Sequence, residues 1–294
     1  MLPNWNCGKC RLSLRGLIKQ SVDLGVSEGI FMSDLTYEEF IQIQEKYEKG
    51  LATTTDLARL EPYRAKRAVL LASGFGSRMM PITINTPKPL VDVNGRQIIT
   101  TILDALLSID IDEIYIVTGY KRECFELLRR SYPMITLLEN PIYDSTNNIS
   151  SACVAKDHFQ NAYVFESDLY LNNPRLLKKY RYYSCYMGVP VDETSDWCFD
   201  TCDGIITDLH KGGQNCHHMF GISYWTVNDG LSLAKDLPEC FAENDETKQR
   251  FWDDVPCVIR RNNYRIAIEE CSFNDVDEID SFFELQEIDA RYRV

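Results

Sequence analysis

From residue 67 onward, short apolar runs alternate with segments in which apolar residues recur every three to four positions. Six apolar runs have the length of strands: 68–72, 113–118, 135–138, 162–166, 184–189 and 220–225. Two of the intervening segments, 98–107 and 124–130, have helical periodicity. Strands that alternate with helices are typical of an α/β fold, so we predict a doubly wound, mostly parallel (mixed) sheet.

Residues 1–64 have a different pattern. Helical segments at 12–24 and 37–47, with Asp34 as the expected N-cap of the second, precede a turn and a third short segment at 53–59. We therefore predict an N-terminal helical module over 1–64 and a main domain over 65–294. Short helices of this kind are typical of helix-turn-helix modules and equally of modules for packing or dimerisation, so a homo-oligomer stays open.

The composition narrows the set of partners. The 294 residues include 44 acidic and 31 basic ones, which gives a net charge of -13. Long-range electrostatics therefore oppose binding to nucleic acid. No apolar run is long enough to cross a membrane, and the first residues lack the features of a secretory signal. We expect a cytoplasmic protein without membrane insertion, whose 11 cysteines are reduced thiols.

The stretch after the first predicted strand is rich in glycine and positive charge. Gly74 and Gly76 have no side chain that would keep a ligand from the backbone, and glycine can adopt positive φ. The backbone N–H groups there can therefore turn toward phosphate oxygens. Arg78 and Lys88 add positive charge. Ligands of doubly wound sheets bind at the carboxyl ends of the strands, where this loop lies. Because the third glycine of the dinucleotide fingerprint and the Walker A pattern are both absent, we expect a phosphate site of another type.

Carboxylates stand at the ends of two further segments. Asp168 follows the strand at 162–166, whereas Glu278 and Asp280 precede a helical stretch near the carboxyl terminus. Carboxylate oxygens are the ligands that Mg²⁺ prefers, and such an ion can bridge a side chain and a phosphate. Asp residues at these positions also suit a turn or a helix N-cap, so both roles stay open.

The string that begins at residue 71 resembles the signature of the sugar-phosphate nucleotidyltransferase superfamily, G-x-G-[ST]-R followed by P-x-T-x-x-x-P-K-x-L. Here it reads GFGSR at 74–78 and PITINTPKPL at 81–90. The resemblance implies a sheet of the nucleotidyltransferase type, catalytic roles for Arg78, Lys88 and Asp168, and a Mg²⁺ site made by Asp168, Asp280 and Glu278. The nucleotide-binding residues that it implies are Leu71, Ala72, Ser73, Gly74, Gly76, Ser77, Arg78, Lys88 and Asn148. Asn148 suits a helix cap equally well.

Further strings between Lys66 and Asp289 resemble bacterial CTP:phosphocholine cytidylyltransferases: NNISSACVA, SDWC, GISYW, FWDD and EECSFNDVDEIDSFFEL. Several of them place aromatic residues beside acids. A quaternary ammonium group donates no hydrogen bonds and is held by cation–π and Coulomb attraction, which such residues supply. The resemblance implies that Trp197, Trp252 and Asp253 bind the acceptor. We add Tyr224, which suits the core equally well.

The predicted reaction transfers CMP from CTP to phosphocholine, giving CDP-choline and pyrophosphate by Mg²⁺-assisted in-line attack. Phosphocholine is already anionic, so the attack needs no general base. Two alternatives stay open: a UTP- or dTTP-dependent sugar-1-phosphate nucleotidyltransferase, and a non-enzymatic nucleotide-sensing regulator. CTP is implied by the resemblance alone, because no residue of the sequence by itself identifies the base.

Overall fold

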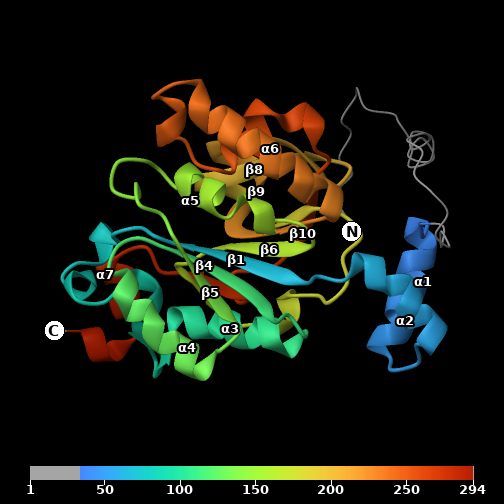
Figure 1. Ribbon diagram of the computed structural model, residues 1–294, viewed down its shortest axis with the longest axis horizontal. Coiled ribbons are helices and arrows are strands. Elements are labelled where there is room, and N and C mark those ends of the chain that lie inside the picture. Colours follow the sequence, from blue (N-terminus) through green and yellow to red (C-terminus); the bar gives the residue numbers. More distant parts are fainter. Residues whose placement is uncertain (1–33, 294) are drawn as a thin grey trace.

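The computed structural model describes residues 34–293 and is built around a seven-stranded sheet (Figure 1). The strand order is β10-β8-β9-β6-β1-β4-β5. The parallel part consists of β1 (Arg67–Ala72), β4 (Glu113–Thr118), β5 (Ile135–Glu139) and β6 (Ala162–Glu166). The long strands β8 (Cys185–Cys202) and β9 (Ile205–Trp225) pair antiparallel, and β10 (Ala267–Glu270) runs parallel to β8. The predicted mixed α/β sheet is thereby confirmed.

Helices cover both faces of the sheet. In Figure 1, α3 (Ile98–Ser108) and α4 (Leu128–Ser131) lie below it, and α5 (Ile149–Val154) and α6 (Val227–Glu243) lie above it. Successive side chains of β1 therefore enter different cores: Ala68 and Leu70 pack in the cluster that contains α3, and Val69 and Leu71 in the one that contains α5 and α6. Burial on both faces explains why the parallel strands appear in the sequence as continuous apolar runs.

Strands β8 and β9, which form a hairpin, are much longer than the two strands predicted from the apolar runs at 184–189 and 220–225. Its tip is a tight turn in which Asp203 and Gly204 both have positive φ, at 50° and 76°. This is the geometry that the dipeptide Asp-Gly favours in two-residue hairpin turns. The pairing of Trp197 with Lys211 falls in the polar outer half of the hairpin, where the predicted strands had already ended.

Two small ribbons complete the main domain. One pairs β2 (Asp92–Val93) with β3 (Arg96–Gln97). The other pairs β7 (Leu169–Leu171) antiparallel with β11 (Val276–Glu278), just before α7 (Phe282–Ile288). The second ribbon joins distant parts of the chain, because the N–H of Ile279 donates to the carbonyl of Asp168 at 3.1 Å. The acidic segment near the carboxyl terminus is thereby held beside the end of β6.

The N-terminal module consists of α1 (Tyr37–Glu48) and α2 (Thr54–Leu60) within the described residues. The predicted helix at 37–47 is confirmed, but its N-cap is Thr36 in a capping box with Glu39, so the choice of Asp34 was wrong. Phe40 and Leu60 are buried against Tyr180 of the main domain. The predicted helix at 12–24 lies outside the described residues, and the boundary between 64 and 65 stays a prediction.

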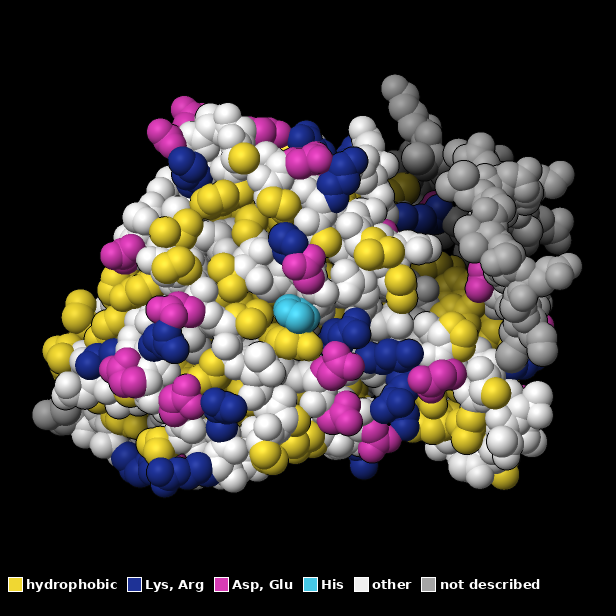
Figure 2. All heavy atoms as spheres, in the orientation of Figure 1, with side chains coloured by type: hydrophobic (Ala, Val, Ile, Leu, Met, Phe, Trp, Pro, Cys, Tyr) yellow, Lys and Arg dark blue, Asp and Glu magenta, His cyan; other side chains and the backbone are white. Residues whose placement is uncertain are grey.

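The surface carries charges of both signs. Figure 2 shows Lys and Arg side chains interspersed with Asp and Glu side chains over one face of the molecule. Ion pairs join several of the charged side chains of the protein, such as Lys179 with Asp110 and Arg67 with Glu113. Among the described helices, none combines the length and the apolar character that a membrane span requires.

Candidate active site

The loop after β1 turns sharply at Gly76. Its φ of 61° lies in the left-handed region, and a Cβ there would stand 3.0 Å from Cβ of Lys88. The carbonyl of Gly76 also accepts the hydroxyl of Thr83 at 2.8 Å. Glycine therefore lets the segment that carries Lys88 approach the loop closely. Gly74 differs, because its φ is not positive and a side chain there would meet open space.

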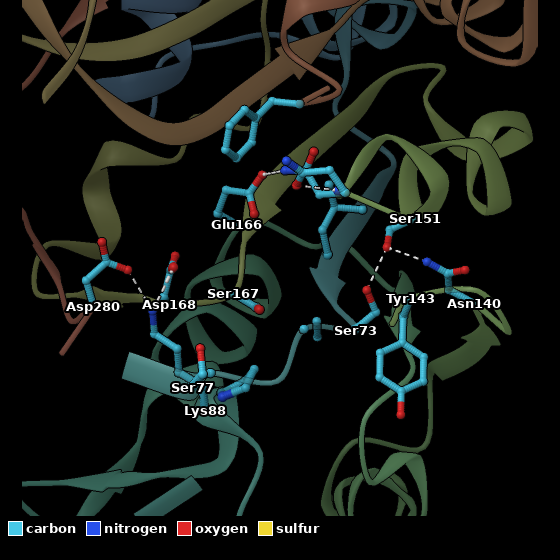
Figure 3. A pocket seen from close by; sticks show the side chains of 18 of the residues that line it. Ser73, Ser77, Lys88, Asn140, Tyr143, Ser151, Glu166, Ser167, Asp168 and Asp280 are labelled. Atoms are coloured by element: carbon cyan, nitrogen blue, oxygen red, sulfur yellow. Dashed lines mark hydrogen bonds and ion pairs between the residues drawn. The ribbon is translucent and has the colours of Figure 1, made fainter. Parts of the chain in front are cut away.

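This loop forms one wall of a cavity of about 420 Å³, which we call the loop cavity (Figure 3). Every residue predicted to bind nucleotide lines it: Leu71, Ala72, Ser73, Gly74, Gly76, Ser77, Arg78, Lys88 and Asn148. Residues that the predictions did not include also line it, among them Asn140, Tyr143 and Ser151. The structure thus brings together segments as far apart in the chain as Leu71 and Asp280.

One end of the loop cavity is charged. The ammonium of Lys88 lies 2.9 Å from Oδ2 of Asp168 and 2.8 Å from Oδ1 of Asp280, and Arg78 reaches the same Asp280 oxygen at 2.9 Å. Burial by itself would lower the pKa of Lys88, but the two carboxylates outweigh it and raise that pKa above its ordinary value. Burial of Asp280 is likewise outweighed by Lys88 and Arg78, so the pKa of Asp280 lies below its ordinary value.

Three predicted metal ligands meet at this end. Asp168, Glu278 and Asp280 each offer a carboxylate oxygen, and these oxygens lie within 4.8 Å of one another. Burial, together with the charges of Asp168 and Asp280, raises the pKa of Glu278 to about 8. Oδ1 of Asp168 is buried and accepts no hydrogen bond from the described residues. Crowded carboxylates with an unpaired oxygen fit a divalent cation, which would relieve their mutual repulsion.

The structure also tests whether Asp280 and Asn148 cap helices, the alternative roles that the sequence left open. The N-cap of α7 is Ser281, whose hydroxyl accepts the N–H of Glu284, so Asp280 does not cap this helix. Asn148 occupies the N-cap position of α5, but its side chain makes no capping hydrogen bond. It donates instead to Oε1 of Glu166 at 2.8 Å and accepts the N–H of Trp252 at 2.9 Å.

The other end of the loop cavity is polar but uncharged. The hydroxyls of Ser73 and Ser151 lie 2.7 Å apart, and the buried amide of Asn140 donates to Ser151 at 3.0 Å. The ring of Tyr143 closes this end, at the opposite side of the cavity from Asp168 and Asp280 in Figure 3. An elongated cavity with one charged and one neutral polar end matches the chemistry of a nucleoside polyphosphate.

A second cavity of about 330 Å³, the hairpin cavity, opens beside the first. Trp197 and Phe251 contribute its aromatic rings, which meet edge to face with centroids 5.5 Å apart. Asp253 is 5% exposed and accepts the hydroxyl of Tyr186 at 2.6 Å; burial raises the pKa of Asp253 to about 7. The remaining charged residues of the lining are Arg78, Glu166, Asp168, Asp196, Lys211, Asp254, Glu278 and Asp280.

Two of the predicted acceptor-binding residues lie elsewhere. Tyr224 is fully buried in the sheet, where it packs on Tyr163, so its assignment to the acceptor pocket was wrong. Trp252 is 2% exposed and packs among core aromatics; it is absent from the lining of the hairpin cavity, and Phe251 lines that cavity in its place. Because Trp252 and Tyr224 occupy core positions, the aromatic enclosure that the sequence predicted is smaller than expected.

The sequence of this chain is similar to those of known nucleotidyltransferases. Residues 67–180, which contain the glycine-rich loop and Asp168, match the family model described as nucleotidyl transferase. The 2-aminoethylphosphonate cytidylyltransferase of Lancefieldella rimae is 36% identical over 233 residues, which cover 76% of this chain and 92% of that protein. The chain belongs to the nucleotidyltransferase family.

Other members of the family point to the same kind of enzyme. The choline-phosphate cytidylyltransferase of Haemophilus influenzae is 32% identical over 217 residues, which cover 73% of this chain and 92% of that protein. The solved structure of the CTP:phosphocholine cytidylyltransferase of Streptococcus pneumoniae matches with a TM-score of 0.71 and 27% identity, over 78% of this chain and all of that one. The fold and the sequence therefore agree on the family, and these relatives are cytidylyltransferases.

Proposed function

We propose that this protein transfers the CMP part of CTP to a small phosphate or phosphonate whose other end is positively charged. The observation that carries the proposal is the junction of the two cavities. The loop cavity holds Arg78 and Lys88 beside carboxylates at one end and neutral polar groups at the other, and the hairpin cavity is lined by aromatic rings and carboxylates. The two share Asp168 and Asp280, so an acceptor in one cavity lies beside the phosphates in the other.

The reaction is a direct displacement. An anionic oxygen of the acceptor forms a bond to the α-phosphorus of CTP, and the bond from that phosphorus to the β-phosphate oxygen breaks, so pyrophosphate leaves with the electron pair. Arg78 and Lys88 neutralise the negative charge that develops on the phosphates. Asp168 and Asp280, with Glu278, would hold a Mg²⁺ ion, which when bound supplies further neutralisation and orients the triphosphate. The acceptor is already anionic, so no residue needs to remove a proton.

Two acceptors fit the hairpin cavity. Phosphocholine, the acceptor expected from the sequence, would place its trimethylammonium group against Trp197 and Phe251, near Asp253. The second candidate is 2-aminoethylphosphonate, the substrate named for the relative from Lancefieldella rimae. The limited number of rings in the lining favours a primary ammonium, because its N–H groups can donate to carboxylates, which the cavity holds in larger number.

A pyrophosphate-release assay tests the proposal. The purified protein is incubated with CTP, UTP or dTTP, each with phosphocholine, 2-aminoethylphosphonate or glucose-1-phosphate, in Mg²⁺ and in a chelator. We expect Mg²⁺-dependent release only with CTP and a cationic acceptor. Release with glucose-1-phosphate and UTP or dTTP would support the sugar nucleotidyltransferase alternative. Binding of nucleotide without release from any pair would support the sensing alternative.

A further inference from the structure

Glu166 stands where the two cavities meet. It is the last residue of β6 and lines both the loop cavity and the hairpin cavity. Asp168 lies two residues further along the chain, in the turn that follows the strand, and lines both cavities as well. Figure 3 shows Glu166 between the Asp168 and Asp280 end of the loop cavity and the polar end with Ser151. Neither the phosphate loop nor the metal cluster described above includes Glu166.

The Glu166 side chain is held in place from two directions. Asn148 donates to Oε1 of Glu166 at 2.8 Å and is itself oriented by the N–H of Trp252. Gly221 of β9 lies directly against the side chain, since a Cβ on it would stand 2.4 Å from Cγ of Glu166. A carboxyl group fixed in this way presents a set direction to a ligand.

The other acids of the hairpin cavity have different neighbours. Asp168, Glu278 and Asp280 form the metal cluster. Asp253 accepts from the hydroxyl of Tyr186, and Asp196 accepts the N–H of Trp197 at 2.8 Å. Glu166 differs from Asp253 and Asp196 because it borders the nucleotide's cavity as well as the acceptor's.

We propose that Glu166 is a specificity-determining residue that pairs with the cationic nitrogen of the acceptor. This inference rests on the proposed function. Glu166 and Asp168 both line the junction of the two cavities, so an acceptor whose phosphorus group lies beside Asp168 can place its nitrogen beside Glu166. With the nitrogen on Glu166 and the phosphorus near Asp168, the acceptor oxygen faces the α-phosphate. The placement of the two acids at this junction then orients the acceptor.

The variant Glu166→Gln tests the charge of this residue without changing its size. The amide oxygen of Gln can still accept from Asn148, so the fold and the neighbouring contacts are kept. Glu270→Gln is the matched control, since Glu270 is also the last residue of a strand but lies outside both cavities. Thermal unfolding followed by circular dichroism verifies that both variants fold.

The assay compares cationic acceptors with neutral analogues of the same shape. Phosphocholine is compared with 3,3-dimethylbutyl phosphate, and 2-aminoethylphosphonate with n-propylphosphonate. For Glu166→Gln we expect kcat/KM with 2-aminoethylphosphonate to fall about 10- to 100-fold, the loss typical of one hydrogen bond to a charged group. With phosphocholine, whose nitrogen donates no hydrogen bond, kcat/KM should also fall, because the Coulomb attraction is lost. The neutral analogues should be unaffected.

Two results would overturn the assignment of Glu166. One is an unchanged kcat/KM of Glu166→Gln with cationic acceptors, and the other is an equal loss with cationic and neutral acceptors, which would indicate a general effect on the site. If the unaltered protein itself turns over no cationic acceptor with CTP, the proposed function fails and the role of Glu166 fails with it. Turnover by the unaltered protein therefore distinguishes failure of the proposed function from failure of the role of Glu166 alone.

Discussion

Lys88 is the side chain whose removal should most directly reveal the electrostatics of the site. Its ammonium is the shared partner of Asp168 and Asp280, and its side chain is 11% exposed against 23% and 21% for theirs. In Lys88→Met the chain keeps a side chain of similar length but leaves three crowded carboxylates without this partner. Removing one partner of a buried ion pair costs 3–5 kcal/mol, and the partial exposure of the acids places this case at about 3 kcal/mol.

Urea unfolding, followed by tryptophan fluorescence, measures this loss. In a metal chelator we expect the free energy of unfolding of Lys88→Met to lie about 3 kcal/mol below that of the unaltered protein. In Mg²⁺ the difference should shrink, because a divalent ion can take the place of the ammonium between the carboxylates. An ion at 100 times its Kd stabilises the folded state by about 2.7 kcal/mol. Turnover should be lost in either buffer, because the proposed mechanism requires Lys88 to neutralise the phosphates.

The control is Lys179→Met, which removes an ion pair with Asp110 far from the site. Asp110 is 67% exposed, so the loss should be below about 1 kcal/mol and should not respond to Mg²⁺. Equal stability of Lys88→Met and the unaltered protein in chelator would refute the reasoning. So would an equal gain from Mg²⁺ in both proteins, because the ion would then not compensate for the missing ammonium.

Three further predictions concern single positions. Asp168→Asn leaves Lys88 paired with Asp280, so the unfolding free energy should change little, whereas Mg²⁺-dependent turnover should fall more than about 100-fold because a direct ligand of the ion is lost; normal turnover would remove Asp168 from the metal site. Gly221→Ala would force a Cβ to within 2.4 Å of Cγ of Glu166, so we expect about 1–3 kcal/mol of destabilisation and a higher acceptor KM with unchanged CTP binding; an unchanged melting temperature would contradict this. Burial of Glu269 is outweighed by Arg181, 2.9 Å away, so the pKa of Glu269 lies below its ordinary value. A lowered pKa stabilises the fold above the unfolded pKa near about 4.3. Glu269→Gln should therefore cost about 3 kcal/mol at pH 7, and this difference should disappear as the pH falls below about 4 in urea unfolding; a constant difference would contradict it.

The parts of the site that the sequence predicted are those set by local order along the chain. Gly76 and Lys88 lie in one short string, and Asp168 directly follows an apolar strand, so strand and loop patterns place them without tertiary information. The meeting of Asp168 with Asp280 depends on the pairing of β7 with β11, which no local pattern reveals. That pair was expected from family resemblance, and the geometry brings the two carboxylates together.

The aromatic wall of the hairpin cavity could not be predicted in the same way. Phe251 and Trp252 are adjacent in the chain, and whichever ring faces the cavity leaves the other to the core. The backbone of this segment is fixed by the hydrogen bond from the Trp252 N–H to Asn148, a residue 104 positions away. Glu166, in contrast, carried a usable signal, since it is the last residue of the strand that Asp168 follows and therefore lies at the same edge of the sheet.

The balance of charge around the junction predicts that a divalent cation would assist nucleotide binding as well as the reaction. The linings of the two cavities together hold the acids Glu166, Asp168, Asp196, Asp253, Asp254, Glu278 and Asp280 but only the cations Arg78, Lys88 and Lys211. A nucleoside triphosphate adds several more negative charges to this space. In a partly buried site such an excess of one sign opposes binding of the polyanion. Nucleotide and divalent cation should therefore enter together, and CTP affinity measured in a chelator should be far weaker than in Mg²⁺.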